Sequence, residues 1–132
     1  MIEILYSFKI FRMGKFRELI AYKKGFSLLM EIHNLTKDFP KIEQHSLVDQ
    51  IRRSSRSVCS SIGEAYKKRR YPNHFISKLT DADMENGETQ VWLDVAPACA
   101  YISNDTYNSL DAKCQEISKL LNFMIHNPAK FA

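Results

Sequence analysis

Cations are the residues of this sequence with the clearest potential for chemistry. Arg52, Arg53 and Arg56 lie close together, and an unbroken run of four cations follows at 67–70. Such a cluster can neutralise the phosphates of a nucleic acid without reading its bases. A solvated helix C-terminus also favours positive charge, so the run at 67–70 has a purely structural alternative. The expected nucleic-acid contacts are Lys67, Lys68, Arg69, Arg70 and Arg52.

Glu85 and Glu88 offer partners for two of these arginines. Counted outward from a turn near residue 71, Arg53 and Arg56 come level with the two glutamates on an antiparallel helix. Because a buried charge needs a partner, we expect Arg53 and Arg56 to form structural ion pairs with the glutamates. Glutamates inside a bundle can also hold two iron or manganese ions, but that site requires Glu-x-x-His motifs, which the sequence lacks. We therefore expect no metal.

Other arrangements that support catalysis are missing from the sequence. Cys59, Cys99 and Cys114 have no C-x-x-C spacing, which argues against a disulfide framework or a zinc site and favours a reducing cytoplasm. Their apolar helical neighbours indicate packed thiols rather than nucleophiles. Neither G-x-G-x-x-G nor a P-loop is present, and no apolar run reaches membrane-spanning length. The sequence thus predicts a cytoplasmic protein that is not an enzyme and has no cofactor.

Helices are the elements that must position these side chains. Only four glycines and four prolines occur among 132 residues, 45% of the residues are hydrophobic, and the net charge of +4 permits an anionic partner. Ser46 and Asn73 are expected to cap the second and third helices. Residues 1–13 are expected to form a leader, 14–127 the bundle domain and 128–132 a tail. Apolar residues at steps of three and four predict helices at 14–37, 46–69, 73–100 and 104–126.

The third predicted helix, which Pro97 is expected to kink, is apolar on two sides. One side carries Phe75, Leu79, Ala82 and Leu93, at the spacing of a stripe that faces a core. The second side also needs cover, and in a chain of this size we expect another subunit to supply it. The expected oligomer interface is Met84, Val91, Trp92 and Val95.

Three motifs carry a resemblance to a known family. They are LVDQIRRS at 47–54, IGEA at 62–65 and ENGETQ at 85–90. With them the sequence resembles the four-helix-bundle proteins associated with intervening sequences of bacterial 23S ribosomal RNA genes. It is also similar to the accessory variability determinant proteins of diversity-generating retroelements. The family commonly reads Asn-Ile-Ala-Glu-Gly where this chain has Ser-Ile-Gly-Glu-Ala at 61–65.

The resemblance implies an all-α protein: an antiparallel up-down four-helix bundle assembled as a ring-shaped homopentamer. It also implies a role in binding nucleic acid, and it brings no enzymatic activity. Two functions remain open at this point. One is an oligomer that binds RNA or DNA through a basic rim at 67–70. The alternative is a protein-interaction scaffold or accessory subunit that binds a protein partner and no nucleic acid of its own.

Overall fold

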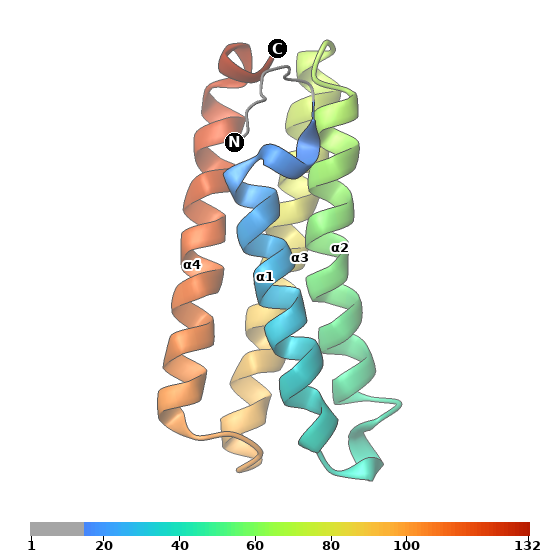
Figure 1. Cartoon of the computed structure of the whole chain (residues 1–132), viewed down its shortest axis with the longest axis vertical. Coiled ribbons are helices and arrows are strands. Elements are labelled where there is room, and N and C mark those ends of the chain that lie inside the picture. The colour runs from blue at the N-terminus through green and yellow to red at the C-terminus, as the bar shows by residue number, and fades with distance from the viewer. Residues whose placement is uncertain (1–14) are drawn as a thin grey trace.

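The computed structural model describes residues 15–132, which form four α-helices and no strand (Figure 1). The prediction of an all-helical fold is confirmed. The leader expected at 1–13 lies outside the described residues. Short 3-10 turns flank or join the helices at Phe16–Glu18, Thr36–Asp38, Lys41–Glu43 and Pro128–Phe131. The helices are α1 (Ile20–Leu35), α2 (Leu47–Lys67), α3 (Pro72–Ala98) and α4 (Asn104–His126).

Consecutive helices run in opposite directions and pack side by side, and α1 closes the bundle by packing against α4 (Figure 1). Short connections favour this up-and-down order, because they can join only neighbouring antiparallel helices. As a result α2 lies between α1 and α3. Any side chain that flanks the buried stripe of α2 must therefore face one of these two helices.

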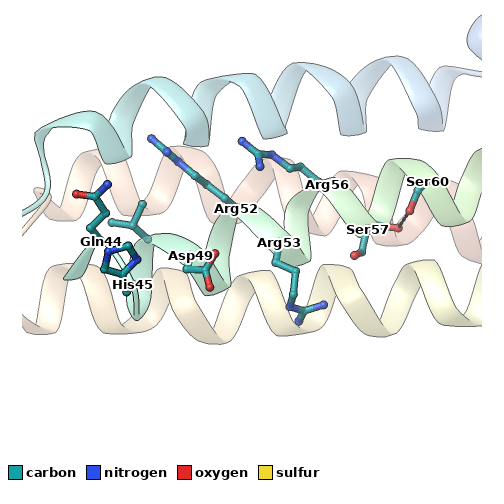
Figure 2. Close-up of a pocket in the computed structure, with 9 residues that line it drawn as sticks. Gln44, His45, Asp49, Arg52, Arg53, Arg56, Ser57 and Ser60 are labelled. Atoms are coloured by element: carbon teal, nitrogen blue, oxygen red, sulfur yellow. Dashed lines mark hydrogen bonds between the residues drawn. The ribbon is translucent and has the colours of Figure 1, made fainter. Parts of the chain in front are cut away.

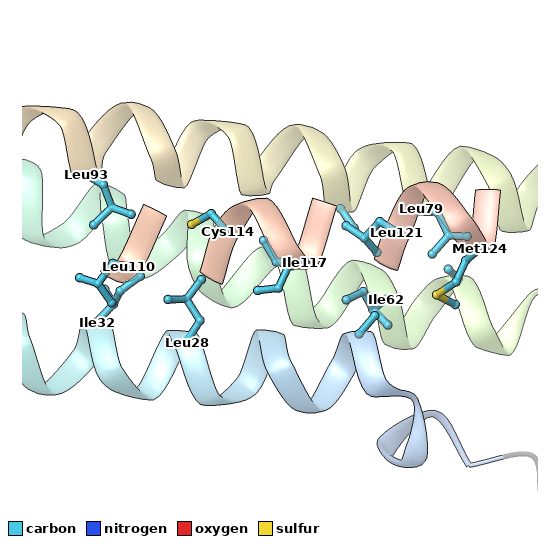
Figure 3. Close-up of a cluster of buried hydrophobic side chains, with 14 of the residues drawn as sticks. Leu28, Ile32, Ile62, Leu79, Leu93, Leu110, Cys114, Ile117, Leu121 and Met124 are labelled. Atoms are coloured by element: carbon cyan, nitrogen blue, oxygen red, sulfur yellow. The ribbon is translucent and has the colours of Figure 1, made fainter. Parts of the chain in front are cut away.

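The core runs the length of the bundle and takes apolar side chains from all four helices (Figure 3). In α2 the buried positions include Ile51, Val58 and Ile62, which recur at the helical period. Burying one such side chain contributes about 1.5–3 kcal/mol to folding. The buried side of α3, which includes Phe75 and Leu79, is as the sequence predicts. Fully or almost fully buried core residues include Leu28 and Ile32 of α1, Ile51 and Ile62 of α2, Phe75 and Leu93 of α3, and Ile117 and Leu121 of α4.

The first helix begins at Ile20 and not at 14, because Phe16–Glu18 forms a separate 3-10 turn, and the starts of the next two helices also differ from the prediction. Ser46 precedes α2, but its side chain does not cap the helix. Glu43 takes that role, since its Oε1 accepts hydrogen bonds from Ser46 Oγ at 2.7 Å and from the Leu47 amide at 3.4 Å. Asn73 is inside α3, because Pro72 begins the helix one residue earlier. Proline suits that first position, where its missing amide has no helical partner to lose.

The C-terminal end of α3 is closed by a backbone motif. Pro97 lies in the last turn, and the helix ends one residue later at Ala98. The Tyr101 amide donates to the Ala96 carbonyl at 2.8 Å, and the Ala100 amide donates to the Pro97 carbonyl at 2.9 Å. Ala100 has a φ of 62°, the left-handed conformation that this Schellman motif requires.

Candidate nucleic-acid interface

The outer face of α2 carries an open groove of about 570 Å³ lined by polar and charged side chains (Figure 2). The groove exists because the apolar stripe of α2 turns inward and leaves the intervening polar positions outside. Its lining is Gln44, His45, Val48, Asp49, Arg52, Arg53, Arg56, Ser57 and Ser60. The three arginines point to different neighbours, and this decides what each of them can do.

Arg52 points toward α1 (Figure 2). Its Nε donates to Thr36 Oγ1 at 2.9 Å, and its Nη2 donates to the His33 carbonyl at 3.0 Å. A cation at the C-terminal end of a helix satisfies carbonyls that lack intrahelical partners and complements the helix dipole. Arg52, an expected nucleic-acid contact, therefore holds the end of α1 in this structure, and it forms no ion pair within residues 15–132.

Arg53 points the other way, toward α3 (Figure 2). Its guanidinium forms a close ion pair with Glu88 and lies 3.5 Å from Glu85 Oε1. Glu88 Oε2 also accepts a hydrogen bond from Trp92 Nε1 at 3.2 Å. The hydrogen bond from Arg53 is the main reason that the pKa of Glu88 lies below its ordinary value. The positive charge of Arg53 is therefore neutralised by carboxylates of α3.

Arg56 does not reach either glutamate, contrary to the expected pairing. Its Nη2 lies 3.4 Å from His33 Nδ1 on α1. The reason is rotation: residues four apart are separated by about 40° around a helix, so Arg56 shares the α1 side with Arg52, whereas Arg53 faces α3. Partial burial and the charges of Arg52, Lys37 and Arg56 lower the pKa of His33. A neutral imidazole can accept a hydrogen bond from Arg56 through Nδ1.

Among the four cations at 67–70, one contacts α2 and the other three are exposed. Arg69 folds back on α2, where Nη1 donates to the Tyr66 carbonyl at 3.0 Å and the guanidinium lies 4.3 Å from the Tyr66 ring centroid. Lys67, Lys68 and Arg70 are exposed and have no ion pair within residues 15–132. Three cations thus project from one end of the bundle, at the connection between α2 and α3.

Of the four side chains expected at a subunit interface, two are exposed and two are partly buried. Met84 is 67% exposed and Val91 54% exposed, and both project outward from α3. Trp92 packs partly against the core and is tied to Glu88, while Val95 is half-buried. Between the two exposed residues, a Cβ added at Gly87 would meet no atom within 4 Å in the described part of the chain. The outward face of α3 therefore has room for a close neighbour.

Asn86 is a feature that the sequence pattern did not predict. It is 1% exposed, and its Nδ2 donates to the Cys114 carbonyl of α4 at 2.8 Å. Its Oδ1 has no hydrogen-bond partner within the described residues. Ser54 and Thr89 form a second buried polar contact at 2.8 Å. In the sequence, the one sign of a buried Asn86 is that a polar residue stands at a position of α3 where the helical period calls for an apolar one.

The thiols and carboxylates show no arrangement typical of catalysis. Burial raises the pKa of Cys59 and of Cys114 to about 12, so these thiols stay protonated at neutral pH. Cys99 is not the packed thiol that we expected: it is exposed, because it lies beyond the end of α3 and away from the core. Residues 15–132 hold no group of three or more histidine, cysteine or acidic side chains placed to bind a metal ion. None of the helices in this part of the chain is long and apolar enough to cross a bilayer.

The fold and the surface together define a class, the small four-helix bundles with a basic end. The chain belongs to the 23S rRNA-intervening sequence protein family, whose sequence profile matches residues 17–123. It is similar in structure to a protein of unknown function of the S23 ribosomal protein family from Bacteroides thetaiotaomicron. The two are 30% identical with a TM-score of 0.72, over 81% of this chain and 96% of that chain. Among curated proteins, none matches this chain significantly.

Proposed function

We propose that this protein is a non-enzymatic oligomer that binds the backbone of RNA or DNA through a basic rim, defined as Lys67, Lys68, Arg69 and Arg70. The observation that carries the proposal is the group of exposed cations Lys67, Lys68 and Arg70, which form no ion pair within residues 15–132, with Arg69 beside them. Lysine and arginine are the usual partners of phosphate oxygens. The family to which the chain belongs is named for an intervening sequence of ribosomal RNA genes, which supports a nucleic acid over other polyanions.

Binding at the rim would depend on charge and not on base sequence. Each cation that neutralises a phosphate releases a counterion, so affinity falls as salt rises. Arg52 would contribute by its charge, since two of its nitrogens are occupied by α1. We expect no readout of base sequence, because no base-reading motif is apparent in the amino-acid sequence.

Assembly of several subunits would multiply a weak contact. We infer that the outward face of α3, with Met84 and Val91 exposed and Trp92 and Val95 beside them, is the subunit interface of a homopentamer. Exposed apolar side chains that gather on one face of a helix are typical of an interaction surface. A ring would present one rim per subunit, and simultaneous contacts raise the effective affinity for a long nucleic acid.

Replacing all four rim residues by glutamine tests the proposal. We expect the slope of log K against log salt to flatten by up to about 3.6 for duplex DNA, because up to four phosphate contacts are removed from each subunit. Fluorescence anisotropy with labelled RNA and DNA at several salt concentrations measures the slope. Circular dichroism must show that the variant keeps its helix content, because Arg69 also holds the end of α2.

A matched control changes the same number of exposed lysines elsewhere: Lys23, Lys41, Lys119 and Lys130. This variant has the same net charge as the rim variant, so a general effect of charge would flatten both slopes equally and contradict a localised rim. If the unmodified protein binds neither RNA nor DNA at low salt, the nucleic-acid proposal is wrong. The scaffold function would then replace it.

A further inference from the structure

A second groove continues the first one along α2. It lies between α1, α2 and the turn that precedes α1, and its volume is about 460 Å³. The two grooves share Arg56 and Ser60, so they form one continuous surface from Gln44 to Lys67. We call this surface the α1–α2 track. It joins the arginines in the middle of α2 to the first cation of the rim.

The second groove is lined by aromatic side chains that remain accessible to solvent. Phe26 is 48% exposed and lies in a stacked arrangement with Tyr22, with ring centroids 6.2 Å apart and planes at 23°. Phe16 meets Tyr22 edge to face at 5.2 Å, which fixes the orientation of the Tyr22 ring. The track thus contains a fixed aromatic surface with an open face beside a row of cations.

The charge of the track is positive along its α1 edge. Arg52 and Arg56 lie there with Lys37 close to His33, and Lys67 lies at the far end. Of the two carboxylates in the lining, Glu64 is held by Lys78 Nζ at 2.8 Å. The other, Asp49, lies near the start of α2. Arg53 contributes little, because Glu85 and Glu88 neutralise it.

Aromatic faces next to cations are the combination that binds single-stranded nucleic acid, where the bases stack on the rings and the phosphates meet the cations. A duplex cannot use such a surface, because its base faces are already stacked inside the helix. From Arg52 to Lys67 the track extends about 22 Å along α2. That length matches about six nucleotides at a stacked rise of about 3.4 Å each.

We propose that the α1–α2 track binds single-stranded RNA or DNA, with a base stacked on Phe26 and phosphates at Arg56 and Lys67. This proposal rests on the proposed function and deepens it, because it names the strandedness of the nucleic acid and the path beyond the rim. The aromatic platform supplies what the rim lacks, a preference for unpaired bases. Sequence preference is still not expected, since every base has a face that can stack.

Phe26→Ala tests the stacking contact. We expect affinity for a labelled single strand of about 12 nucleotides, roughly twice the length of the track, to fall about 5- to 150-fold. Affinity for the duplex of the same sequence should not change. Phe123→Ala is the matched control, because Phe123 is 51% exposed on α4, outside the track. It should leave both affinities unchanged.

Arg56→Gln tests the phosphate contact through a different measurement, the salt dependence of binding. The slope of log K against log salt should flatten by about 0.7 for the single strand, the value for one lost phosphate contact. Lys119→Gln, a change of equal charge on the exposed face of α4, should leave the slope unchanged. Flattening of equal size in both variants would contradict a contact at Arg56.

The outcomes separate this proposal from the proposed function. Equal or tighter binding of the duplex, or unchanged single-strand binding by Phe26→Ala, would overturn the track and leave the rim standing. No binding of any nucleic acid by the unmodified protein would overturn both. Sedimentation equilibrium of Phe26→Ala gives the remaining test: if the variant without nucleic acid dissociates, a second copy of the chain covers Phe26 and the track is wrong.

Discussion

At the scale of single residues, the partner of each arginine depends more on its angle around α2 than on its height along the helix. Arg53 and Arg56 lie at similar heights to Glu85 and Glu88, yet only Arg53 contacts them. Arg56 is rotated by about 60° from Arg53 around α2, and it lies against His33 on α1 instead. Three arginines within five residues thus have three different neighbours: Arg52 holds the end of α1, Arg53 joins α2 to α3, and Arg56 lies against the His33 ring.

Ala100 occupies a backbone conformation that disfavours a side chain. Its φ of 62° costs an L-residue about 1–2 kcal/mol, and glycine has no such cost. Glycine also gains more freedom in the unfolded chain, which offsets part of the benefit. We expect Ala100→Gly to raise the free energy of unfolding by up to about 1 kcal/mol in urea denaturation.

Ala98→Gly is the control for this substitution, because Ala98 is exposed in the last turn of α3 with ordinary helical geometry. It should lower the free energy of unfolding by about 0.5–1 kcal/mol. A loss of stability in both variants would mean that the Schellman motif does not hold Ala100 in the left-handed conformation in solution.

Tyr107 should make the bundle sensitive to high pH. Its hydroxyl donates to Asp94 Oδ1 at 2.6 Å, and this hydrogen bond is the main reason that the pKa of Tyr107 is raised to about 12. Because the folded pKa exceeds the ordinary value near 10, the stabilisation is complete below about pH 10 and disappears as the pH rises toward about 12. Thermal unfolding midpoints across this range should show the loss.

Tyr107→Phe should remove the part of this loss that belongs to Tyr107, so its midpoint falls less steeply over the same range. Tyr71→Phe is the matched control, since Tyr71 is 64% exposed and its hydroxyl has no hydrogen bond among the described residues. Identical pH profiles for wild type and Tyr107→Phe would show that the hydrogen bond to Asp94 does not persist in solution.

At the scale of elements, α2 packs the core with one set of positions and contacts its neighbouring helices through charged side chains at another. Its apolar stripe, including Ile51 and Ile62, holds the core together, and the arcs on either side of the stripe carry charge toward α1 and α3. Helix α3 also presents different side chains on two sides. Its α2 side carries the carboxylates that meet Arg53, and its outward side carries Met84 and Val91.

The ion pair between α2 and α3 should stabilise the bundle only slightly. The Arg53 side chain is 46% exposed and that of Glu88 35% exposed. Solvent screens charges at this depth, so a double-mutant cycle with Arg53→Met and Glu88→Gln should give a coupling energy under about 1 kcal/mol. Since the pKa of Glu88 is lowered, the coupling is present at neutral pH and should vanish as the pH falls through that pKa.

A second cycle between Arg53→Met and Glu116→Gln provides the control, because Glu116 lies on α4 and pairs with Lys24. Its coupling should be indistinguishable from zero. A coupling of about 3–5 kcal/mol for Arg53 and Glu88 would contradict the exposed geometry and indicate a pair buried by a neighbouring subunit.

At the scale of the whole molecule, the prediction concerns assembly. Met84→Asp and Val91→Asp place a charge on the outward face of α3 and should dissociate the expected homo-oligomer without unfolding the bundle. Sedimentation equilibrium measures the mass, and circular dichroism measures the helix content. These positions test the interface better than Trp92, because Trp92 packs partly on the core and its loss would also destabilise the monomer.

Ile42→Asp is the control for a charge introduced at an exposed apolar residue. Ile42 is 85% exposed in the turn before α2, away from the outward face of α3. It should leave the mass unchanged. A monomeric wild-type protein at micromolar concentration would contradict the oligomer, and the outward residues of α3 would then be ordinary surface side chains.

The sequence by itself determined the fold class and the buried faces of the helices. The spacing of Ile51, Val58 and Ile62 is enough to predict the buried face of α2, because helical periodicity is a local property of the sequence. The basic residues at 67–70 were equally evident, since a charge run is visible in any fold.

The tertiary structure alone decided which partner each charge has. Height along a helix follows from counting, but the direction of Arg52, Arg53 and Arg56 depends on how α2 is rotated between its two neighbours. The buried Asn86 likewise depends on a contact between segments far apart in the chain, because its Nδ2 donates to the Cys114 carbonyl of α4. Local sequence cannot specify such contacts, because they form only when four helices pack around one core.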